Sequence, residues 1–409
     1  MSIKKMIPRE LYSFFLKKKF SPSGFIKNKN LKIKMATTKE EFDAGLRLLH
    51  DCYTSKKYMQ PDPSGYFLNS FTLLPETNLV VALINTKVIG AVYIYRDSYL
   101  GLPSDKYYGK INDYYRKTDQ KLAEMSAIAV HQTFRNRDQA IFLLLMKYAL
   151  IFSKQFLQTS RLILNVGIEN QVFYEALWPF ERRGGILKYP HSTDAFSIFM
   201  GLDLDKINLE RRNFLDLNLR TNLNIQSFIS QRDERLLFPI RNQGQIIFPT
   251  LNFDLVNYFF KEKTTFLDKL KKNDFLFFNE IYLPLFGRNN LEKLVEPSKV
   301  DYIIRKYRVP VDLFVAFNVN GKDVFTKMTD ISSQGCFVKF PPNQTLTWQG
   351  ENVSLKFNMQ GKNFAIDAKI IWENKGQNSK TPRGYGIEFL KPHPEIYDLA
   401  KSMLYSIAR

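Results

Sequence analysis

Glu124 is the only carboxylate in a strand-like run, LAEMSAIAV, that leads directly into an arginine-bearing turn, FRNRDQA. A long apolar helix pattern, IFLLLMKYALIF, follows this turn at once. The free N–H groups and the dipole at a helix start attract anions, and Arg135 and Arg137 would add direct charge. Residues 121–140 therefore predict a phosphate site beside a strand that carries one carboxylate. The simpler alternative is a helix capped by Asp138, with two solvated arginines.

A second group of polar residues lies near the C-terminus, in TDISSQGCFVKF and in RKYRVPVDL just upstream. Asp330, Ser332 and Gly335 have the spacing D-x-S-x-x-G, which predicts a tight turn. Asp and Ser can hydrogen-bond a base or a phosphate there, and a glycine allows close approach. Arg305 and Arg308 can neutralise a phosphate or stack on a base. These residues form a second candidate binding site.

Strand-like and helix-like patterns must position these residues. In residues 31–205 the two alternate, from the strand LKIKM and a helix capped by Thr37 or Thr38 to a last strand, AFSIFMGLDL. We therefore expect an α+β chain whose first domain has one mixed sheet with flanking helices. Residues 206–300 predict a mostly helical connector. Residues 301–409 contain short strands typical of a six-stranded antiparallel β-barrel, and a closing helix, PEIYDLAKSMLYSIA.

The composition limits the class of protein. The chain has 409 residues and a formal net charge of +19, so we expect more than one domain and anionic partners. Cys52 and Cys336 lie far apart, and we expect reduced packing residues in a cytoplasmic protein. Residues 1–30 form a basic leader that would stay solvated or contact the inner membrane surface. We find no recognition helix, base-stacking motif or zinc-spaced cluster, so we expect no nucleic acid polymer and no metal.

The order of elements in residues 31–205 resembles that of the GNAT acyltransferases, in which the turn after the central strand holds the phosphates of the acyl carrier. The family pattern is Gln or Arg, two residues, Gly, one residue, and Gly or Ala. Arg135 and Ala140 match it, whereas Asp138 replaces the first glycine. The excursion DSYLGLPSD before the Glu124 strand is similar to the FeeM-type N-acyl amino acid synthases. In outline the stretch is also similar to the acyl-homoserine lactone synthases.

This resemblance implies a reaction and a set of residues. An acyl group on phosphopantetheine would pass from acyl carrier protein to the amine of an amino acid or a similar small amine. Glu124 would take the amine proton and Tyr174 would protonate the thiolate; the alternatives are a salt-bridged strand charge and a buried aromatic residue. The residues expected to bind the carrier's phosphate are Arg135, Arg137, Gln139 and Ala140. A carboxylate at Asp138 should repel the pyrophosphate of coenzyme A more than the single phosphodiester of a carrier protein.

The C-terminal motif resembles the D-x-S-x-x-G signature of PilZ domains, and GYGIEFL resembles their late strand. The residues that this resemblance assigns to binding of cyclic di-GMP, a regulatory ligand, are Arg305, Arg308, Asp330, Ser332 and Gly335. The family usually spaces two arginines as R-x-x-x-R, and with Arg308 as the second the first position is Ile304. Binding is then weakened or lost unless Arg305 compensates. The alternative is a degenerate barrel that mediates protein contacts.

We therefore expect a bacterial cytoplasmic N-acyltransferase that uses acyl carrier protein and is regulated by cyclic di-GMP. Two alternatives stay open at this point. One is an acyl-CoA-dependent N-acetyltransferase, and the other is a cyclic di-GMP receptor without catalytic activity.

Overall fold

The computed structural model of the chain describes two compact units. The ranges described are 30–98, 100–135, 139–188, 195–207, 225–295 without 243, 249 and 271, 308–339 without 333, 348–374, and 383–399 without 392, 394, 397 and 398. The first unit contains the chain up to Leu68, Asn78–Tyr115 and Gln120–Phe238, and the second contains Asn69–Thr77, Arg116–Asp119 and the chain from Pro239.

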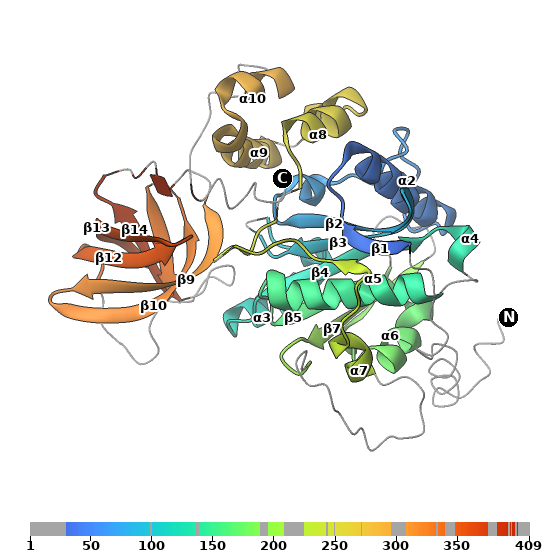
Figure 1. Cartoon of the computed structure of the whole chain (residues 1–409), viewed down its shortest axis with the longest axis horizontal. Coiled ribbons are helices and arrows are strands. Elements are labelled where there is room, and N and C mark those ends of the chain that lie inside the picture. Colours follow the sequence, from blue (N-terminus) through green and yellow to red (C-terminus); the bar gives the residue numbers. More distant parts are fainter. Residues whose placement is uncertain are drawn as a thin grey trace. The chain divides into compact units, whose positions relative to one another are not determined.

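The first unit is built on an eight-stranded mixed sheet with the order β6-β7-β5-β4-β3-β2-β1-β8 (Figure 1). Its strands are β1 (Leu31–Met35), β2 (Thr77–Ile84), β3 (Lys87–Arg96), β4 (Leu122–Val130), β5 (Arg161–Gly167), β6 (Glu181–Lys188), β7 (Phe196–Asp203) and β8 (Leu236–Leu237). β4 pairs with β5, and β1 with β8, in parallel. The expected mixed sheet with flanking helices is confirmed.

Helices of the first unit cover both faces of this sheet. They are α2 (Lys39–Ser55), α3 (Asp105–Lys117), α4 (Gln132–Arg135), α5 (Gln139–Ile151), which continues as the π-helical η4 (Phe152–Phe156), the 3₁₀ turn η5 (Ile168–Asn170), α6 (Gln171–Leu177) and α7 (Ile225–Ser230). Thr38 caps α2, and Glu41 completes a capping box with it, so the second of the two threonines is the cap.

α2 and α5 pack on opposite faces of the sheet. A Cβ added to Gly45 of α2 would contact Val81 of β2, whereas a Cβ added to Gly90 of β3 would contact Ala82 of β2 and Leu145 of α5. Successive residues of a strand point to opposite faces, so the Val81 face carries α2 and the Ala82 face carries α5.

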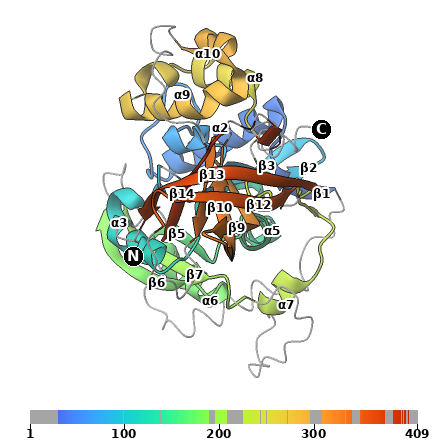
Figure 2. The same ribbon diagram turned by 90° about the vertical axis from the view of Figure 1, so that its left-hand side faces the viewer.

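The second unit contains a closed antiparallel barrel of six strands in the order β10-β11-β14-β13-β12-β9 (Figure 2). They are β9 (Val309–Val319), β10 (Lys322–Ile331), β11 (Gly335–Lys339), β12 (Asn352–Met359), β13 (Lys362–Asn374) and β14 (Gly384–Phe389). Alternate residues of β9, such as Leu313, Val315 and Phe317, fill the interior. The predicted barrel is confirmed.

Short helices make up most of the rest of the second unit. They are η3 (Ser70–Leu73), α8 (Phe253–Asn257), η6 (Tyr258–Glu262), η7 (Leu267–Lys269), α9 (Lys272–Phe286) and α10 (Arg288–Leu294). Residues 1–29 of the basic leader and most of the stretch expected to form the closing helix lie outside the described residues.

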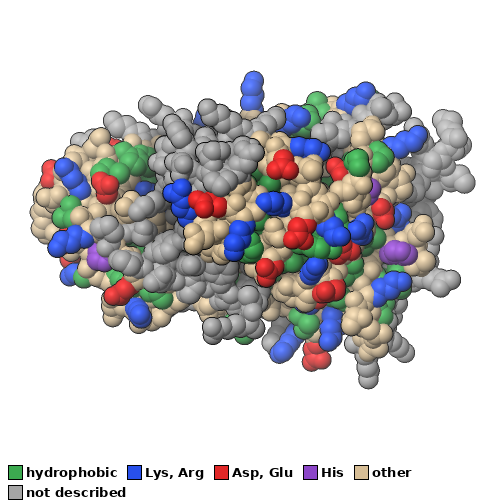
Figure 3. Space-filling model, turned by 90° about the horizontal axis from the view of Figure 1, so that it is seen from above, with side chains coloured by type: hydrophobic (Ala, Val, Ile, Leu, Met, Phe, Trp, Pro, Cys, Tyr) green, Lys and Arg blue, Asp and Glu red, His purple; other side chains and the backbone are tan. Residues whose placement is uncertain are grey.

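The charge surplus is not gathered into one patch on the face in Figure 3, where Lys and Arg side chains alternate with Asp and Glu. In the part of the chain that the structure describes, no helix has the length and apolar character needed to cross a lipid bilayer. The same residues include no group of three or more His, Cys, Asp or Glu arranged to hold a metal ion.

Candidate active site

The central feature of the first unit is a gap between β4 and β5. The parallel ladder joins Leu122–Glu124 to Arg161–Ile163, and no further pairing follows among the described residues of the two strands. On its other side β4 bulges: its register with β3 runs from Tyr93↔Ser126 to Ala91↔Ala129, so β4 has one extra residue there. Ala127 lies in this bulge with a left-handed φ of 50°. The bulge and the gap leave backbone N–H and C=O groups in the middle of the sheet outside the strand ladders.

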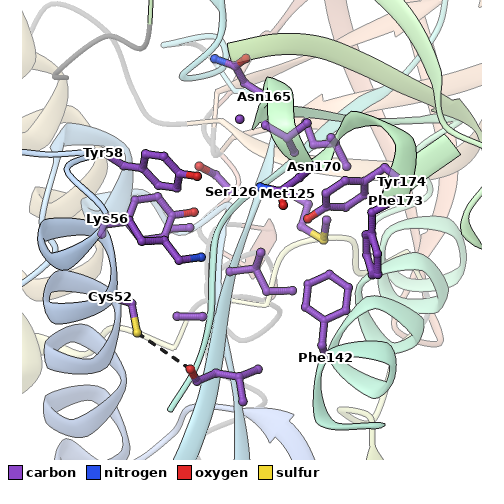
Figure 4. A pocket seen from close by; sticks show the side chains of 18 of the residues that line it. Cys52, Lys56, Tyr58, Met125, Ser126, Phe142, Asn165, Asn170, Phe173 and Tyr174 are labelled. Carbon is purple, nitrogen blue, oxygen red and sulfur yellow. Dashed lines mark hydrogen bonds between the residues drawn. The ribbon is translucent and has the colours of Figure 1, made fainter. Parts of the chain in front are cut away.

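A cavity of ≈ 290 Å³ occupies this gap (Figure 4). Figure 4 shows α2-side residues on one flank of the strands and α5 and α6 residues on the other. Since α2 and α5 cover opposite faces, the cavity joins the two faces of the sheet. Its lining residues are Cys52, Tyr53, Lys56, Tyr58, the β4 residues from Met125 to Val130, Arg135, Phe142, the β5 residues from Leu164 to Gly167, Asn170, Phe173 and Tyr174.

The α5 and α6 side of the cavity is an aromatic wall. Phe142 of α5 meets Phe173 and Tyr174 of α6 edge to face, with ring centroids 5.3 and 6.3 Å away. Tyr174 is 5% exposed and packs against Phe180 as well. Such a wall suits an apolar chain, with one phenol group within it. Tyr174, predicted as the proton donor, therefore lies in the cavity.

The α2 side of the cavity is polar and cationic. Arg135 donates from Nε to the carbonyl of Val130 (2.7 Å), and its terminal nitrogen lies 2.8 Å from Sγ of Cys52. Lys56 follows the last turn of α2 and lines the same cavity. The hydroxyl of Tyr58 donates to the carboxylate of Glu169. Together these contacts connect the end of α2 to the ends of β4 and β5.

Glu124 lies on β4 at the last paired position before the gap and is 3% exposed. The backbone N–H of Ser104 donates to its Oε2 at 2.9 Å, and Asn112 in turn donates to the Ser104 hydroxyl. Burial raises the pKa of Glu124 to about 7, against the lowering effect of the Ser104 hydrogen bonds. Glu124 is not one of the residues that line the cavity, although Met125 and Ser126 are.

Glu124 and Ser126 lie on the α2 face of the sheet. They pair with Tyr95 and Tyr93 of β3, which alternate with Gly90 on the α5 face. Asn165 of β5 shares this α2 face, because Glu124 pairs with Ile163, two residues before Asn165. The strand thus places Ser126, which lines the cavity, two residues from Glu124 on the same face.

The predicted phosphate turn is described only in part. Arg135 ends α4 and lines the cavity, and α5 begins at Gln139, so Gln139 and Ala140 form the helix start as expected. Arg137 and Asp138 lie outside the described residues, as do the side chains of Gln139 and Ala140. The guanidinium of Arg135 is directed to Cys52 of α2 rather than along α5.

The barrel motif brings four of its five predicted residues into one turn region. Arg308 pairs with Asp330 at 2.9 Å, just before β9 and near the end of β10. The backbone N–H of Ser332 donates to the carbonyl of Gly335 at 2.8 Å, which closes the turn between β10 and β11. A side chain at Gly335 would collide with the Ile387 carbonyl, so this position requires glycine. Arg305 lies outside the described residues.

Several cavity residues were not predicted from the sequence. They are Cys52, Lys56, Tyr58, Ser126, Phe142 and Asn165. Ser126 and Phe142 lie in the stretches around the predicted phosphate turn but were not singled out there, and the α2 residues are far from β4 in the chain. The twin lysines that end the α2 pattern, in YTSKKYM, were the only signal.

Comparison with known proteins identifies both regions. Residues 44–203 match the family model of the N-acyl amino acid synthase FeeM, and residues 304–406 match the PilZ domain model. No curated protein matches the chain.

Among solved structures, the chain is similar to FeeM, an N-acyl amino acid synthase from uncultured soil microbes (20% identity, 43% of this chain, 91% of that chain, TM-score 0.38). It is also similar to BjaI, a CoA-dependent acyl-homoserine lactone synthase (14% identity, 51% of this chain, 93% of that chain, TM-score 0.38). A third is the PilZ domain of CeSA from a cellulose-synthesizing bacterium (15% identity, 25% of this chain, 100% of that chain, TM-score 0.20).

The family models confirm both resemblances that the sequence motifs suggested. The chain joins a region that matches the FeeM-type N-acyl amino acid synthase model to a C-terminal region that matches the PilZ domain model.

Proposed function

We propose that the cavity between β4 and β5 transfers a fatty acyl group from the phosphopantetheine of acyl carrier protein to the amine of an amino acid or a similar small amine. The observation that carries this proposal is the position of the cavity. It connects an aromatic wall on the α5 and α6 face with polar groups on the α2 face. A donor can therefore enter from one face and an acceptor from the other.

The donor fits the α5 side. The first N–H groups of a helix have no acceptor within the helix, and the helix dipole favours negative charge there, so the start of α5 would receive a phosphate. The phosphopantetheine arm would follow the gap, where the two strands leave each other's hydrogen-bonding groups free. The acyl chain would pack on Phe142 and Phe173, and a backbone group freed at the Ala127 bulge would polarise the thioester carbonyl.

The acceptor amine needs to lose protons as it attacks. Its nitrogen forms the new C–N bond at the thioester carbonyl, and the C–S bond then breaks. The carboxylate of Glu124 receives the amine proton through Ser126 or one water, because Ser126 lines the cavity two residues from Glu124 on the same strand face. Tyr174 provides a proton to the departing thiolate and regains one from solvent, and Glu124 releases the amine proton to solvent before the next turnover.

The PilZ barrel would bind cyclic di-GMP and regulate this reaction. Arg308 and the turn from Asp330 to Gly335 supply a cation, a carboxylate and a close backbone approach. Regulation requires the nucleotide to have different affinity for two states of the chain.

The proposed function is tested by mass spectrometry of organic extracts from a host that expresses the protein, the Glu124→Gln variant or an empty vector. We expect long-chain N-acyl amino acids or amines only with the unaltered chain. A cyclic di-GMP synthase is co-expressed in a parallel set of hosts. Extracts that match the empty vector in both sets would favour a receptor without catalytic activity.

The donor is tested by replacing Asp138. Asp138→Gly is expected to raise kcat/KM with acyl-CoA about 10-fold, because it removes a negative charge that repels the pyrophosphate. With acyl carrier protein as donor, kcat/KM should change less than about 3-fold for the same reason. Both donors are compared in steady-state assays that quantify the N-acyl product.

Two variants complete the donor test. Asp138→Asn separates the charge from the flexibility of glycine, and Asp205→Asn removes the same charge from an exposed site away from the cavity. A large gain with acyl-CoA together with no turnover on acyl carrier protein would favour the acyl-CoA-dependent enzyme instead.

A further inference from the structure

Two phenylalanine side chains project from the outer surface of the barrel. Phe314 of β9 is 77% exposed and Phe325 of β10 is 76% exposed. The two strands are neighbours (Figure 1), and Phe325 pairs with Ala316, two residues from Phe314. Because side chains alternate between the two faces of a strand, Phe314, Ala316 and Phe325 all lie on the outer face. The two rings are therefore diagonal neighbours across the strand pair and form one exposed apolar surface.

Lysines flank these rings on both sides. Lys327 of β10 pairs with Phe314, and its Nζ lies 5.1 Å from the centre of the Phe314 ring. On the other side of β9, the exposed Lys356 of β12 pairs with Ala316. The next neighbour of Lys356, on β13, is the uncharged Ala365, and Lys356 has no ion pair among the described residues. The outer face thus combines two aromatic rings with two ammonium groups.

The carboxylates near the rings leave the charge of Lys356 uncompensated. Asp312 accepts from Lys327 at 3.1 Å, and its side chain is only 14% exposed. Asp323 lies at the tip of the β9–β10 hairpin, directly after the exposed Lys322. Each aspartate therefore has a lysine of its own beside it. The charge that remains on this outer face is positive, which matches an anionic partner.

The shape of the surface favours a lipid partner over a protein. The six strands close into a barrel, so their outer face is convex, and the two rings project from it. A protein partner would need a pocket for each ring, whereas the fluid interface of a bilayer opens around an aromatic side chain. A second copy of the chain would bring the same lysines to the contact, because a twofold interface joins identical surfaces.

We propose that Phe314, Phe325, Lys327 and Lys356, here called the Phe–Lys patch, bind the surface of a membrane that contains anionic lipids. The rings enter the interface below the headgroups, and the lysine stems lie along them while the ammonium groups contact lipid phosphates. This inference goes beyond the proposed function and does not depend on it, because no residue of the cavity between β4 and β5 takes part.

The inference is tested by flotation of the full chain with vesicles of phosphatidylcholine, alone or mixed with phosphatidylglycerol. We expect the unaltered chain to float with the mixed vesicles. The double variant Phe314→Ser, Phe325→Ser should partition into them roughly 10-fold more weakly for each ring removed, because the burial of that ring in lipid is lost. Lys356→Gln should weaken binding to the mixed vesicles about 5-fold, since one contact with the anionic surface is lost.

Leu390→Ser is the matched control. Leu390 is 58% exposed and directly follows β14, which lies across the barrel from β9 in the strand order. Loss of this apolar side chain should leave flotation unchanged. A direct readout comes from Phe325→Trp, whose indole emission should be quenched by vesicles with brominated lipid tails. All these side chains are exposed, so the melting temperature of each variant should stay close to that of the unaltered chain.

Three outcomes would overturn the inference. The first is an unaltered chain that does not float with the mixed vesicles. The second is equal flotation of the unaltered chain and the double variant, which would assign membrane binding to another part of the chain. The third comes from analytical ultracentrifugation, alone and with acyl carrier protein: a dimer or a complex that only the double variant loses would assign the Phe–Lys patch to a protein partner.

Discussion

Glu124→Gln is expected to lower kcat for N-acylation by about 10²- to 10⁴-fold, the usual range for loss of a general base. Glutamine keeps the size of the side chain, and its amide oxygen can still accept from the Ser104 N–H. The KM of both substrates should stay close to that of the unaltered enzyme, since Glu124 does not line the cavity. Steady-state assays with saturating donor and acceptor measure the change.

The pH dependence of activity provides a second readout of the same residue. Burial raises the pKa of Glu124 to about 7, and only the ionised carboxylate can take a proton. The activity of the unaltered enzyme should therefore fall as the pH drops below about 7. The activity of Glu124→Gln should not show this fall at low pH, because the variant has no carboxyl left to titrate there.

As the pH rises, the stability of the unaltered chain should fall while its activity increases. A carboxyl whose pKa is raised in the folded state stabilises the fold at low pH, and this contribution is lost as the pH rises through the folded pKa. This contribution is lost between pH 4.5, the ordinary pKa of a glutamate, and about pH 7. The pKa difference corresponds to about 3 kcal/mol of unfolding free energy. At pH 8 the free energy of unfolding of Glu124→Gln should thus exceed that of the unaltered chain by up to about 3 kcal/mol.

Glu76→Gln is the control for these measurements, because Glu76 is also buried (4% exposed) but lies just before β2, a strand that does not border the gap. It should leave kcat and its pH profile unchanged. Full activity in Glu124→Gln would show that Glu124 is a structural carboxyl, and another base would have to be sought on the α2 face.

Most of the fold could be predicted because the patterns were regular. The alternation in β9 and the long apolar runs of β2 and β3 identified strands by themselves. α3 was not predicted as a helix, because eleven of its thirteen residues are charged, aromatic or amide side chains and its apolar face is made of tyrosines. β6 was also missed: its sequence, ERRGGILK, carries charges and two glycines, and it is a largely exposed edge strand that pairs with β7.

From local patterns alone, the site could be predicted only where its residues follow one another in the chain, and Tyr174 was predicted from the family resemblance. Glu124, Arg135 and the start of α5 belong to one stretch, so their proximity was visible in the sequence. Lys56 comes from α2, and it reaches the cavity because the sheet brings that helix across β4. Proximity of this kind depends on which faces of a sheet are covered by which helices, and no local pattern records it.

The second large effect is expected in the barrel. Arg308→Ala should weaken binding of cyclic di-GMP roughly 10- to 100-fold, in line with the loss of an arginine that contacts a base edge or a phosphate. The loss has two parts. A cation for the phosphate disappears, and Asp330 is left without its 2.9 Å partner, so that its carboxylate would face the incoming phosphate alone. Isothermal titration calorimetry with cyclic di-GMP measures the change in Kd.

Lys327→Ala provides the matched control, because Lys327 also pairs with an aspartate on the barrel, Asp312, at 3.1 Å. It removes the same charge from the same barrel and leaves the turn from Asp330 to Gly335 unchanged. Its Kd should stay within about 3-fold of the unaltered value, apart from the salt-dependent effect of one surface charge. Equal Kd values for Arg308→Ala and Lys327→Ala would contradict a role of Arg308 in binding.

The same variants connect the barrel to catalysis. If cyclic di-GMP changes the rate of N-acylation through this turn, the nucleotide concentration that gives half the effect should rise in Arg308→Ala by the same factor as its Kd, and Lys327→Ala should respond normally. A nucleotide effect on the rate that persists unchanged in Arg308→Ala would mean that the ligand acts elsewhere. Binding without any effect on the rate would leave the barrel as a docking module, and the two states that regulation requires would then be absent.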